Sequence, residues 1–252
     1  MEIAGKKAVV VGGASGMGRA TAQLLAERGA SVAVLDRVDS AGSDIASQLS
    51  GLFEPVDITD FIEAEGALRS AHGRLKGLDI VVTTAGGGVA ARTLSKSGPH
   101  DLQTFRDVLD LNAVATFNIC RIAAALMADN DAVDDERGVL VNTSSIAAFE
   151  GQIGQVAYSA AKAAIAGMCL TMARDLGGLG IRVCAIAPSL FDTGALTGIP
   201  DEQKAKLVAG AAFPHRMGQP IEYARLAAAI IENPMLNGQC IRLDAGQRFG
   251  PR

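Results

Sequence analysis

The sequence is poor in the residues that build metal sites and redox motifs. It has no tryptophan, two tyrosines and three widely separated histidines. Its four cysteines are equally dispersed and form no C-x-x-C pair: Cys120, Cys169, Cys184 and Cys240. This spacing excludes the usual zinc motifs, and the cysteines are expected to be small buried apolar residues of a reducing compartment. We therefore predict no metal site and a cytoplasmic location.

Long apolar runs and an excess of basic charge are also missing. The start, "MEIAGKKAVVVGG", has no h-region typical of a signal peptide. No window of about 18 residues is free of charge or strong polarity, so we expect no membrane span. Net charge is −4, with lysines and arginines scattered along the chain. We therefore expect neither a nucleic-acid nor a membrane partner.

Short apolar runs do occur, and they alternate with amphipathic segments over nearly the whole chain. Strands are expected at 7–11, 31–35, 52–56, 79–83, 138–143, 182–187 and 239–243. Helices are expected near 16–28, 40–49, 60–73, 101–128, 155–176 and 220–232. This alternation predicts an α/β fold in one domain, 1–252, with a parallel sheet of about seven strands covered by helices on both faces.

Two loops follow predicted strands and are longer or richer in glycine than ordinary connections. They are "AGGGVAARTLSKSGPH" at 85–100 and "APSLFDTGALTGIPDEQ" at 187–203, the second opening a predicted substrate loop near 187–216. Ligands of such sheets bind outside the carboxyl ends of the strands. Both loops are therefore expected on the functional edge.

The first predicted strand leads into the glycine-rich turn "VVVGGASGMGRA". Gly12 and Gly16 would let the backbone approach a pyrophosphate, and Gly18 would let the following helix pack closely on the sheet. The free N–H groups at the start of that helix would bind the anion. The position of these glycines between a strand and a helix predicts a dinucleotide site.

Two acidic residues end the next two predicted strands. Asp36 can bind both ribose hydroxyls of NAD and repel the 2′-phosphate of NADP, so we predict NAD as the cofactor. The neighbouring Arg37 could accommodate that phosphate instead. Asp57 could reach the adenine ring or cap the following helix, and the sequence leaves both roles open.

The segment "SSIAAFEGQIGQVAYSAAK", 144–162, contains the expected reacting groups. Tyr158 and Lys162 are four residues apart and would share one face of a helix. A nearby cation is expected to lower the pKa of the phenol by about 1–3 units, making Tyr158 a usable acid or base. Either Ser144 or Ser145 could hydrogen-bond a carbonyl oxygen, and strand periodicity does not choose between them.

Together these motifs resemble the short-chain dehydrogenase/reductase family, in content and in order. The matching stretches are the Gly12-x-x-x-Gly16-x-Gly18 turn, "TTAG" at 83–86, "LNAVATFN" around Asn112, Ser145 and Tyr158-x-x-x-Lys162. The resemblance implies a Rossmann-type doubly wound sheet. It also assigns Ser145, thirteen positions before Tyr158, to the carbonyl, Tyr158 to the proton, Lys162 to the ribose and Asn112 to a proton relay.

A closer resemblance is to the type 2 3-hydroxyacyl-CoA dehydrogenases, carried by "AAFEGQIGQVAYSAAK", "IRVCAIAPSLFDT", "FPHRMGQPIEYA" and "IIENPMLNGQCIRLDA". Relatives of that group also oxidise hydroxysteroids, use NAD and form homotetramers. The resemblance implies substrate contacts from Gln152 and Gln155 beside Ser145 and Tyr158. It implies cofactor contacts from Gly12, Ser15, Gly16, Met17, Gly18, Asp36, Asp57, Ile58, Ala85, Gly86, Tyr158, Lys162, Pro188 and Phe191.

Three positions depart from the family pattern. Val11 replaces a threonine, Thr84 replaces the asparagine of N-A-G, and Ser189 replaces a glycine. Each departure is expected to loosen one supporting hydrogen bond or turn while leaving the catalytic set intact.

The leading hypothesis is NAD-linked interconversion of a secondary alcohol and a ketone, with a 3-hydroxyacyl-CoA or a hydroxysteroid as substrate. An NADPH-dependent 3-oxoacyl reductase of fatty-acid synthesis is the alternative, which Asp36 disfavours. A non-catalytic NAD-binding scaffold protein is a hypothesis of another class. It is disfavoured because four reacting groups are retained.

Overall fold

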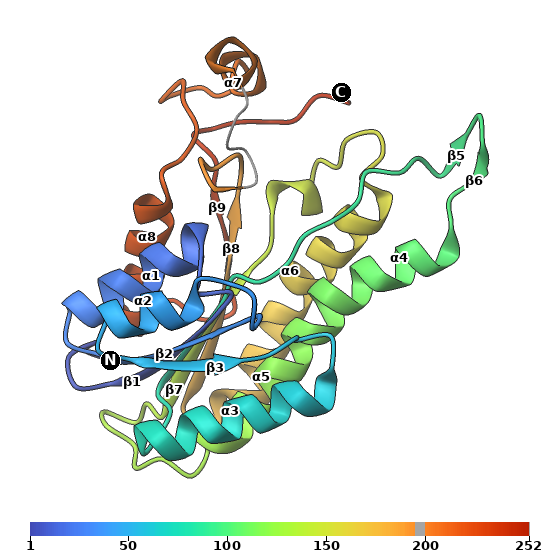
Figure 1. Cartoon of the computed structure of the whole chain (residues 1–252). Coiled ribbons are helices and arrows are strands. Elements are labelled where there is room, and N and C mark those ends of the chain that lie inside the picture. The colour runs from blue at the N-terminus through green and yellow to red at the C-terminus, as the bar shows by residue number, and fades with distance from the viewer. Residues whose placement is uncertain (195–199, 252) are drawn as a thin grey trace.

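The protein is built on one central parallel sheet, and its structure, a computed structural model, describes residues 1–194 and 200–251. The sheet has seven strands in the order β3-β2-β1-β4-β7-β8-β9 (Figure 1), and all the neighbours pair in parallel. Their bounds are β1 Lys7–Val11, β2 Ser31–Asp36, β3 Leu52–Pro55, β4 Ile80–Thr83, β7 Gly138–Thr143, β8 Ile181–Pro188 and β9 Cys240–Leu243. The predicted α/β class, strand set and doubly wound order are confirmed.

Helices cover both faces of this sheet. One face carries α1 (Gly16–Glu27), α2 (Gly42–Gln48) and α8 (Pro220–Glu232), and the other carries α3 (Phe61–Leu75), α5 (Ala115–Met127) and α6 (Val156–Gly177). Every residue of β4, β7 and β8 is buried. These strands are mostly apolar on both faces rather than alternating, as parallel strands between two helical layers require.

The strand order reverses between β1 and β4. The chain proceeds from β1 outward to β3, returns to β4 beside β1, and then builds the other half of the sheet. A crevice forms at such a switch point because the loops after the two strands diverge to opposite sides. The turn after β1 and the loop after β4 therefore form the two walls of this crevice.

Two predicted elements differ in detail. The expected helix at 101–128 is a continuous helical run made of α4 (Leu102–Leu109), a π-helical turn (Asp110–Val114) and α5. The expected loop at 85–100 contains a short antiparallel hairpin, β5 (Leu94–Ser95) with β6 (Gly98–Pro99), outside the main sheet. The loop after β8 is followed by α7 (Asp201–Leu207), and positions 195–199 of the predicted substrate loop lie outside the described residues.

Two helices are notably apolar. By length and composition the run Leu102–Met127 and α6 are sufficient to cross a membrane, although both contain charged side chains. Within their most apolar windows, 56% and 39% of the residues are buried inside the protein. Core helices of folded domains meet the same criterion, because their apolar faces pack on a sheet.

Candidate active site

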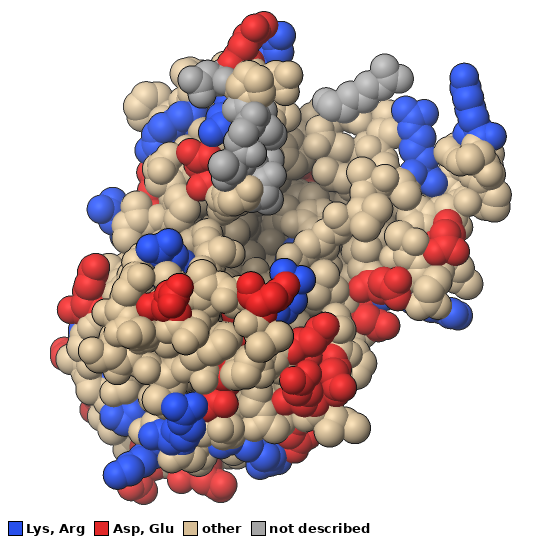
Figure 2. Space-filling model, viewed as in Figure 1, with Lys and Arg blue, Asp and Glu red and all other residues tan. Residues whose placement is uncertain are grey.

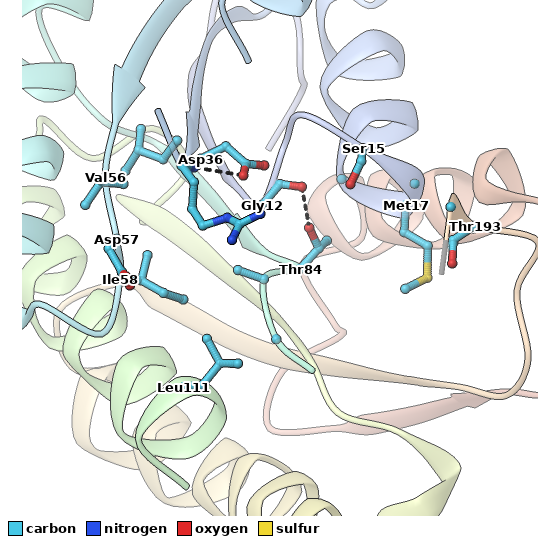
Figure 3. Close-up of a pocket in the computed structure, with 17 residues that line it drawn as sticks. Gly12, Ser15, Met17, Asp36, Val56, Asp57, Ile58, Thr84, Leu111 and Thr193 are labelled. Atoms are coloured by element: carbon cyan, nitrogen blue, oxygen red, sulfur yellow. Dashed lines mark hydrogen bonds between the residues drawn. The ribbon is translucent and has the colours of Figure 1, made fainter. Parts of the chain in front are cut away.

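A cavity of about 560 Å³ lies at the switch point of the sheet. Ten of the predicted cofactor contacts line it: Gly12, Ser15, Gly16, Met17, Gly18, Asp36, Asp57, Ile58, Ala85 and Gly86. Figure 2 shows a hollow at the centre of this face, with largely uncharged surface inside it. In Figure 3 the side chains of Asp36, Val56 and Ile58 lie toward one end of the cavity, and Met17 and Thr193 lie toward the other.

The glycines of the first turn form a bare backbone cradle. A Cβ on Gly12 would lie 2.6 Å from the amide nitrogen of Ala85, and one on Gly18 would overlap the carbonyl oxygen of Gly12. Gly12 and Gly16 also have φ values of +79° and +49°, which favour glycine. The first N–H groups of α1 follow directly, so the cradle fits a pyrophosphate.

Thr84 supports this cradle. Its hydroxyl donates to the carbonyl of Val11 at 3.0 Å and lies 3.2 Å from the carbonyl oxygen of Gly12 (Figure 3). The threonine therefore joins the end of β4 to the glycine turn, so a hydrogen bond supports the turn at this departure from the family pattern. A Cβ on Gly18 would also clash with the Thr84 hydroxyl oxygen.

Asp36 ends β2 at the rim of the cavity. One carboxylate oxygen accepts from the backbone N–H of Ala14 at 2.9 Å, and the other accepts from the backbone N–H of the next residue, Arg37, at 2.9 Å. These bonds fix the carboxylate beside the glycine turn. The Arg37 side chain also lines the cavity, but it is largely exposed and its guanidinium lies 3.5 Å from Asp39.

Asp57 lies at the cavity and does not cap the following helix. It lines the cavity, and its carboxylate also accepts from the amide and the hydroxyl of Thr59 at 2.9 and 2.7 Å. The Thr59 hydroxyl, followed by its amide, lowers the pKa of Asp57. The cap of α3 is Asp60, which accepts from Ile62 and Glu63. Asp57 therefore orders the turn before the cap.

A pair of reciprocal hydrogen bonds joins the end of β7 to the first turns of α6. The Ser144 hydroxyl donates to the carbonyl of Lys162 at 2.8 Å, and the Lys162 ammonium donates to the carbonyl of Thr143 at 2.9 Å. Both side chains are buried. Ser144 is thus engaged with the α6 backbone, and the neighbouring serine is turned the other way.

Ser145 faces the phenol of Tyr158. Its hydroxyl oxygen accepts from the amide of Ala147 at 3.1 Å and caps a short 3-10 turn, Ile146–Ala148, while its hydrogen bond to Tyr158 favours the phenolate. The Lys162 ammonium lies 5.6 Å from the centroid of the Tyr158 ring. The structure therefore brings Ser145, Tyr158 and Lys162 together, as the family spacing predicted.

The two titrating groups of this cluster are both biased toward their neutral forms. Burial raises the pKa of Tyr158 above its usual value of 10, and the Ser145 hydrogen bond only partly opposes this. Burial lowers the pKa of Lys162 from 10.5 to about 8. The expected lowering of the Tyr158 pKa by Lys162 is wrong for the protein alone, because desolvation of the phenol outweighs the distant charge.

Asn112 lies in the π-helical turn and is fully buried. Its amide donates to the carbonyls of Gly87 and Val108 at 2.7 and 2.8 Å, and its oxygen accepts from the Gly87 amide at 3.2 Å. A Cβ on Gly86 would lie 2.6 Å from the Asn112 oxygen and 3.1 Å from the Lys162 nitrogen. Asn112 therefore holds the loop after β4 against the Lys162 end of the cluster.

The structure separates Pro188 and Phe191 from the cavity residues. Pro188 ends β8, and the Phe191 ring is buried against Gly218 in the core beneath α8. Their predicted place at the cavity is taken by Thr193 and Gly194. Sequence reasoning located this loop but not which of its residues reach inward, because loop conformation has no fixed period.

Further residues of the cavity wall were missed. They are the apolar side chains Leu35, Val56 and Leu111, together with Thr84. Leu35 and Val56 flank the predicted acids at two strand ends, which is the signal that could have found them. Leu111 immediately precedes Asn112 and offered no such signal.

Gln152 and Gln155 lie away from this cavity, in the wall of a second one of about 500 Å³. The Gln155 side-chain oxygen accepts from the Gln152 amide at 3.0 Å, and the two side chains lie 3.4 Å apart. The pair closes the loop that precedes α6. This second cavity also includes Arg92 and Ser159.

A bare backbone cradle beside a serine, a tyrosine and a buried lysine defines a dinucleotide-dependent oxidoreductase. The chain belongs to the short chain dehydrogenase family, whose model matches residues 6–204. It is therefore an enzyme that uses a nicotinamide cofactor.

Individual relatives are similar over nearly the whole chain. It is 47% identical to 3-hydroxyacyl-CoA dehydrogenase type-2 of Drosophila melanogaster, covering 96% of this chain and 97% of that protein. Identity to the Homo sapiens protein of the same name is 46%, with 99% and 97% covered.

Solved structures agree with this likeness. The crystal structure of 3-hydroxyacyl-CoA dehydrogenase type-2 from Mycobacterium avium superposes with a TM-score of 0.95 at 39% identity, over 98% of both chains. A 7α-hydroxysteroid dehydrogenase complexed with NADH and 7-oxo glycochenodeoxycholic acid superposes with a TM-score of 0.88 at 28% identity, over 100% of this chain and 97% of that one.

The cradle predicts that Gly18→Ala loses NADH affinity by about tenfold or more and destabilises the fold by about 1–3 kcal/mol, because the new methyl overlaps the Gly12 carbonyl. Fluorescence titration with NADH and thermal unfolding measure the two effects. Gly66→Ala is the matched control, because Gly66 is also helical and a Cβ there meets nothing within 4 Å. A Gly18→Ala protein that binds NADH like Gly66→Ala would contradict the close packing of the cradle.

The buried lysine predicts a pH-dependent gain from Lys162→Met. The lowered pKa of Lys162 corresponds to about 3 kcal/mol of destabilisation near neutral pH, offset by about 1 kcal/mol from the hydrogen bond to Thr143. Between about pH 8 and 10.5 the unfolded chain still holds the proton that the folded protein has released, so wild-type stability rises. Urea unfolding of both proteins across this range should show the advantage of Lys162→Met shrinking as pH rises. A pH-independent difference would contradict the buried charge.

Proposed function

We propose that this enzyme interconverts a secondary alcohol and a ketone with NAD, acting on 3-hydroxyacyl-CoA substrates. The observation that carries the proposal is the cluster of Ser145, Tyr158 and Lys162 where β7 ends and α6 begins. Support for the substrate class comes from the relatives named 3-hydroxyacyl-CoA dehydrogenase type-2. The hydroxysteroid dehydrogenase neighbour makes a hydroxysteroid the second substrate to test.

In this proposal each residue of the cluster has a separate task. Ser145 donates a hydrogen bond to the substrate oxygen, which stabilises its developing negative charge. Tyr158 takes the alcohol proton during oxidation and returns it during reduction. The Gly12–Gly18 cradle and Asp36 would hold a nicotinamide cofactor, which would supply the hydride chemistry when bound.

Lys162 and Asn112 support that proton transfer. In its charged form Lys162 stabilises the phenolate of Tyr158, and its position beside Gly86 lets it reach a cofactor ribose. Asn112 holds the Gly87 backbone and would complete a proton relay through water. The raised pKa of Tyr158 keeps the phenol protonated at neutral pH, so the oxidation rate should increase toward alkaline pH.

The preference for NAD over NADP rests on Asp36. Its carboxylate is anchored by the Ala14 amide at the end of β2, where it can accept from ribose hydroxyls and would repel a 2′-phosphate. Arg37 lies 3.5 Å from the Asp39 carboxylate and extends into solvent, which reduces its availability to a phosphate.

We also propose that the enzyme is a cytoplasmic homotetramer assembled through α5 and α6. Phe117 and Leu170 are 47% and 45% exposed on these helices. Several small residues of α6 also face outward: Ala160, Ala163, Ala164 and Gly167 are exposed or half-buried, whereas Ala157, Ala161 and Ala173 pack inside. The cysteines are free thiols, which suits a reducing compartment.

The proposal predicts that Tyr158→Phe lowers kcat by about 10²–10⁴-fold while NADH binding is retained, because the proton donor is lost and the ring is kept. Steady-state reduction of acetoacetyl-CoA and NADH titration provide the two measurements. Tyr223→Phe is the control, because Tyr223 is the other tyrosine and its hydroxyl contacts Thr143 within the core. If Tyr158→Phe turned over like Tyr223→Phe, the mechanism would be wrong.

Cofactor choice gives a second prediction. Asp36→Asn keeps an oxygen that accepts from Ala14 and removes the negative charge, so the NAD-to-NADP ratio of kcat/KM should fall by roughly 10- to 100-fold. Rates with both cofactors on wild type and variant decide the point. A wild-type enzyme that prefers NADPH would instead support the 3-oxoacyl reductase, and tight NADH binding without turnover on acyl-CoA or hydroxysteroid substrates would support a scaffold.

A further inference from the structure

The last described part of the chain, residues 242–251, lies between two loops of the molecule. Figure 1 shows this red segment crossing from the side of α7 toward the loop that precedes α6. The backbone of Ile153 donates to the carbonyl of Pro251 at 3.0 Å, which confirms that the segment reaches this loop. We call residues 242–251 the C-terminal segment and residues 149–155 the pre-α6 loop.

The pre-α6 loop is held by a network of charges centred on Glu150. Arg242 binds its two carboxylate oxygens with both terminal nitrogens, at 2.9 and 3.1 Å, and Arg248 adds a third contact at 3.3 Å. The amide of Phe249 also donates to Glu150, at 3.1 Å. One carboxylate of the loop therefore collects four contacts from the C-terminal segment.

The arginines of this network are themselves fixed. Asp244 accepts from Arg242 at 2.7 Å and from Arg248 at 2.9 Å, and the Arg242 guanidinium lies 5.3 Å from the centroid of the Phe149 ring. Arg242 and Glu150 are each 23% exposed, and Asp244 is 9% exposed. Forked, partly buried pairs of this kind keep their geometry, unlike single pairs on an open surface.

The same segment also holds the opposite side. The side chain of Gln247 is buried and donates to the carbonyl of Leu207, at the end of α7, at 2.8 Å. The amides of Ala212 and Phe213 both donate to the carbonyl of Ala245. The C-terminal segment therefore joins the region after α7 to the pre-α6 loop.

The pre-α6 loop lies between two residues of the reacting cluster. It follows Ser145 by a few positions and leads directly into the turn of α6 that carries Tyr158. Its residues line the second cavity together with Arg92, Thr93 and Leu94, and Gln155 bridges to Ala91. A shift of this loop would therefore change the space on the substrate side without touching the glycine cradle.

We propose that the C-terminal segment is a positioning device for the substrate, which acts through Glu150 and Arg242 on the pre-α6 loop. This inference rests on the proposed function, because it assigns the loop to the acyl side of the ketone substrate. Glu150 and Arg242 contact neither the reacting atoms nor the nucleotide cavity. Their loss is therefore expected to act on substrate binding and not on cofactor binding.

Glu150→Gln tests the device, because it preserves shape and removes the charge. We expect the KM for acetoacetyl-CoA to rise roughly 5- to 30-fold, with kcat and the NADH Kd each within about threefold of wild type. Arg242→Lys keeps the positive charge and loses the two-nitrogen contact with Glu150, so its KM should lie between those of wild type and Glu150→Gln. In the double variant Glu150→Gln/Arg242→Lys the effects should be less than additive, because both changes break the same pair.

Glu232→Gln is the control for losing one carboxylate charge, because Glu232 forms a single, more exposed 2.7 Å pair with Arg28, between α8 and the residue that follows α1. Its KM should equal that of wild type. If Glu150→Gln folds poorly, Arg248→Met removes the more exposed arginine and should raise KM by a smaller factor in a stable protein. The thermal unfolding of every variant is measured as well, to show that each one is folded.

The outcomes separate this inference from the proposed function. A wild-type enzyme that turns over acetoacetyl-CoA, with an unchanged KM in Glu150→Gln and Arg248→Met, would overturn the positioning role alone. An equal loss of NADH affinity and ketone affinity would also overturn it, because the network would then act on the whole fold. Absence of turnover in wild type would overturn the proposed function itself.

Discussion

Two reciprocal hydrogen bonds hold the reacting half of this enzyme together. Ser144 donates to the backbone of Lys162, and Lys162 donates to the backbone of Thr143, so the end of β7 and the start of α6 fix each other. Ser145 and Tyr158 come from the same two elements and face each other only while that seam holds. Ser144 thus has a structural role, and Ser145 has the proposed catalytic role.

The site combines an open, polar half with a dry one. Cofactor-side groups such as Asp36 are anchored by backbone amides at the rim, whereas Tyr158 and Lys162 lie where burial disfavours both phenolate and ammonium. Burial therefore keeps the phenol protonated at neutral pH, and a charged Lys162 makes the phenolate less costly. These two titrating groups are buried at the expense of stability.

Much of this arrangement could be predicted from the sequence. The fully buried parallel strands are mostly apolar, and glycines mark the places where backbone meets backbone, so the sheet and the Gly12–Gly18 cradle were predictable. Family spacing singled out Ser145, the serine that lies beside Tyr158, where periodicity did not choose. The direction of the Tyr158 pKa shift was not predictable, because it depends on how completely the phenol is desolvated. The inward direction of Phe191 was not predictable, because loop residues obey no period and the ring's direction is set by a distant partner, Gly218.

The π-helical turn around Asn112 also changes the phase of the long helical run. One extra residue in the turn rotates everything after it by about 100° relative to an uninterrupted α-helix. The face of α5 that packs on the sheet, which includes Ile119 and Ala123, is therefore out of step with the face of α4 that meets α6. A single-residue deletion within 110–114 would bring the two faces into register and turn the Asn112 side chain away from Gly87. The irregular turn is thus what allows one helical run to serve the core at one end and the active-site loop in its middle.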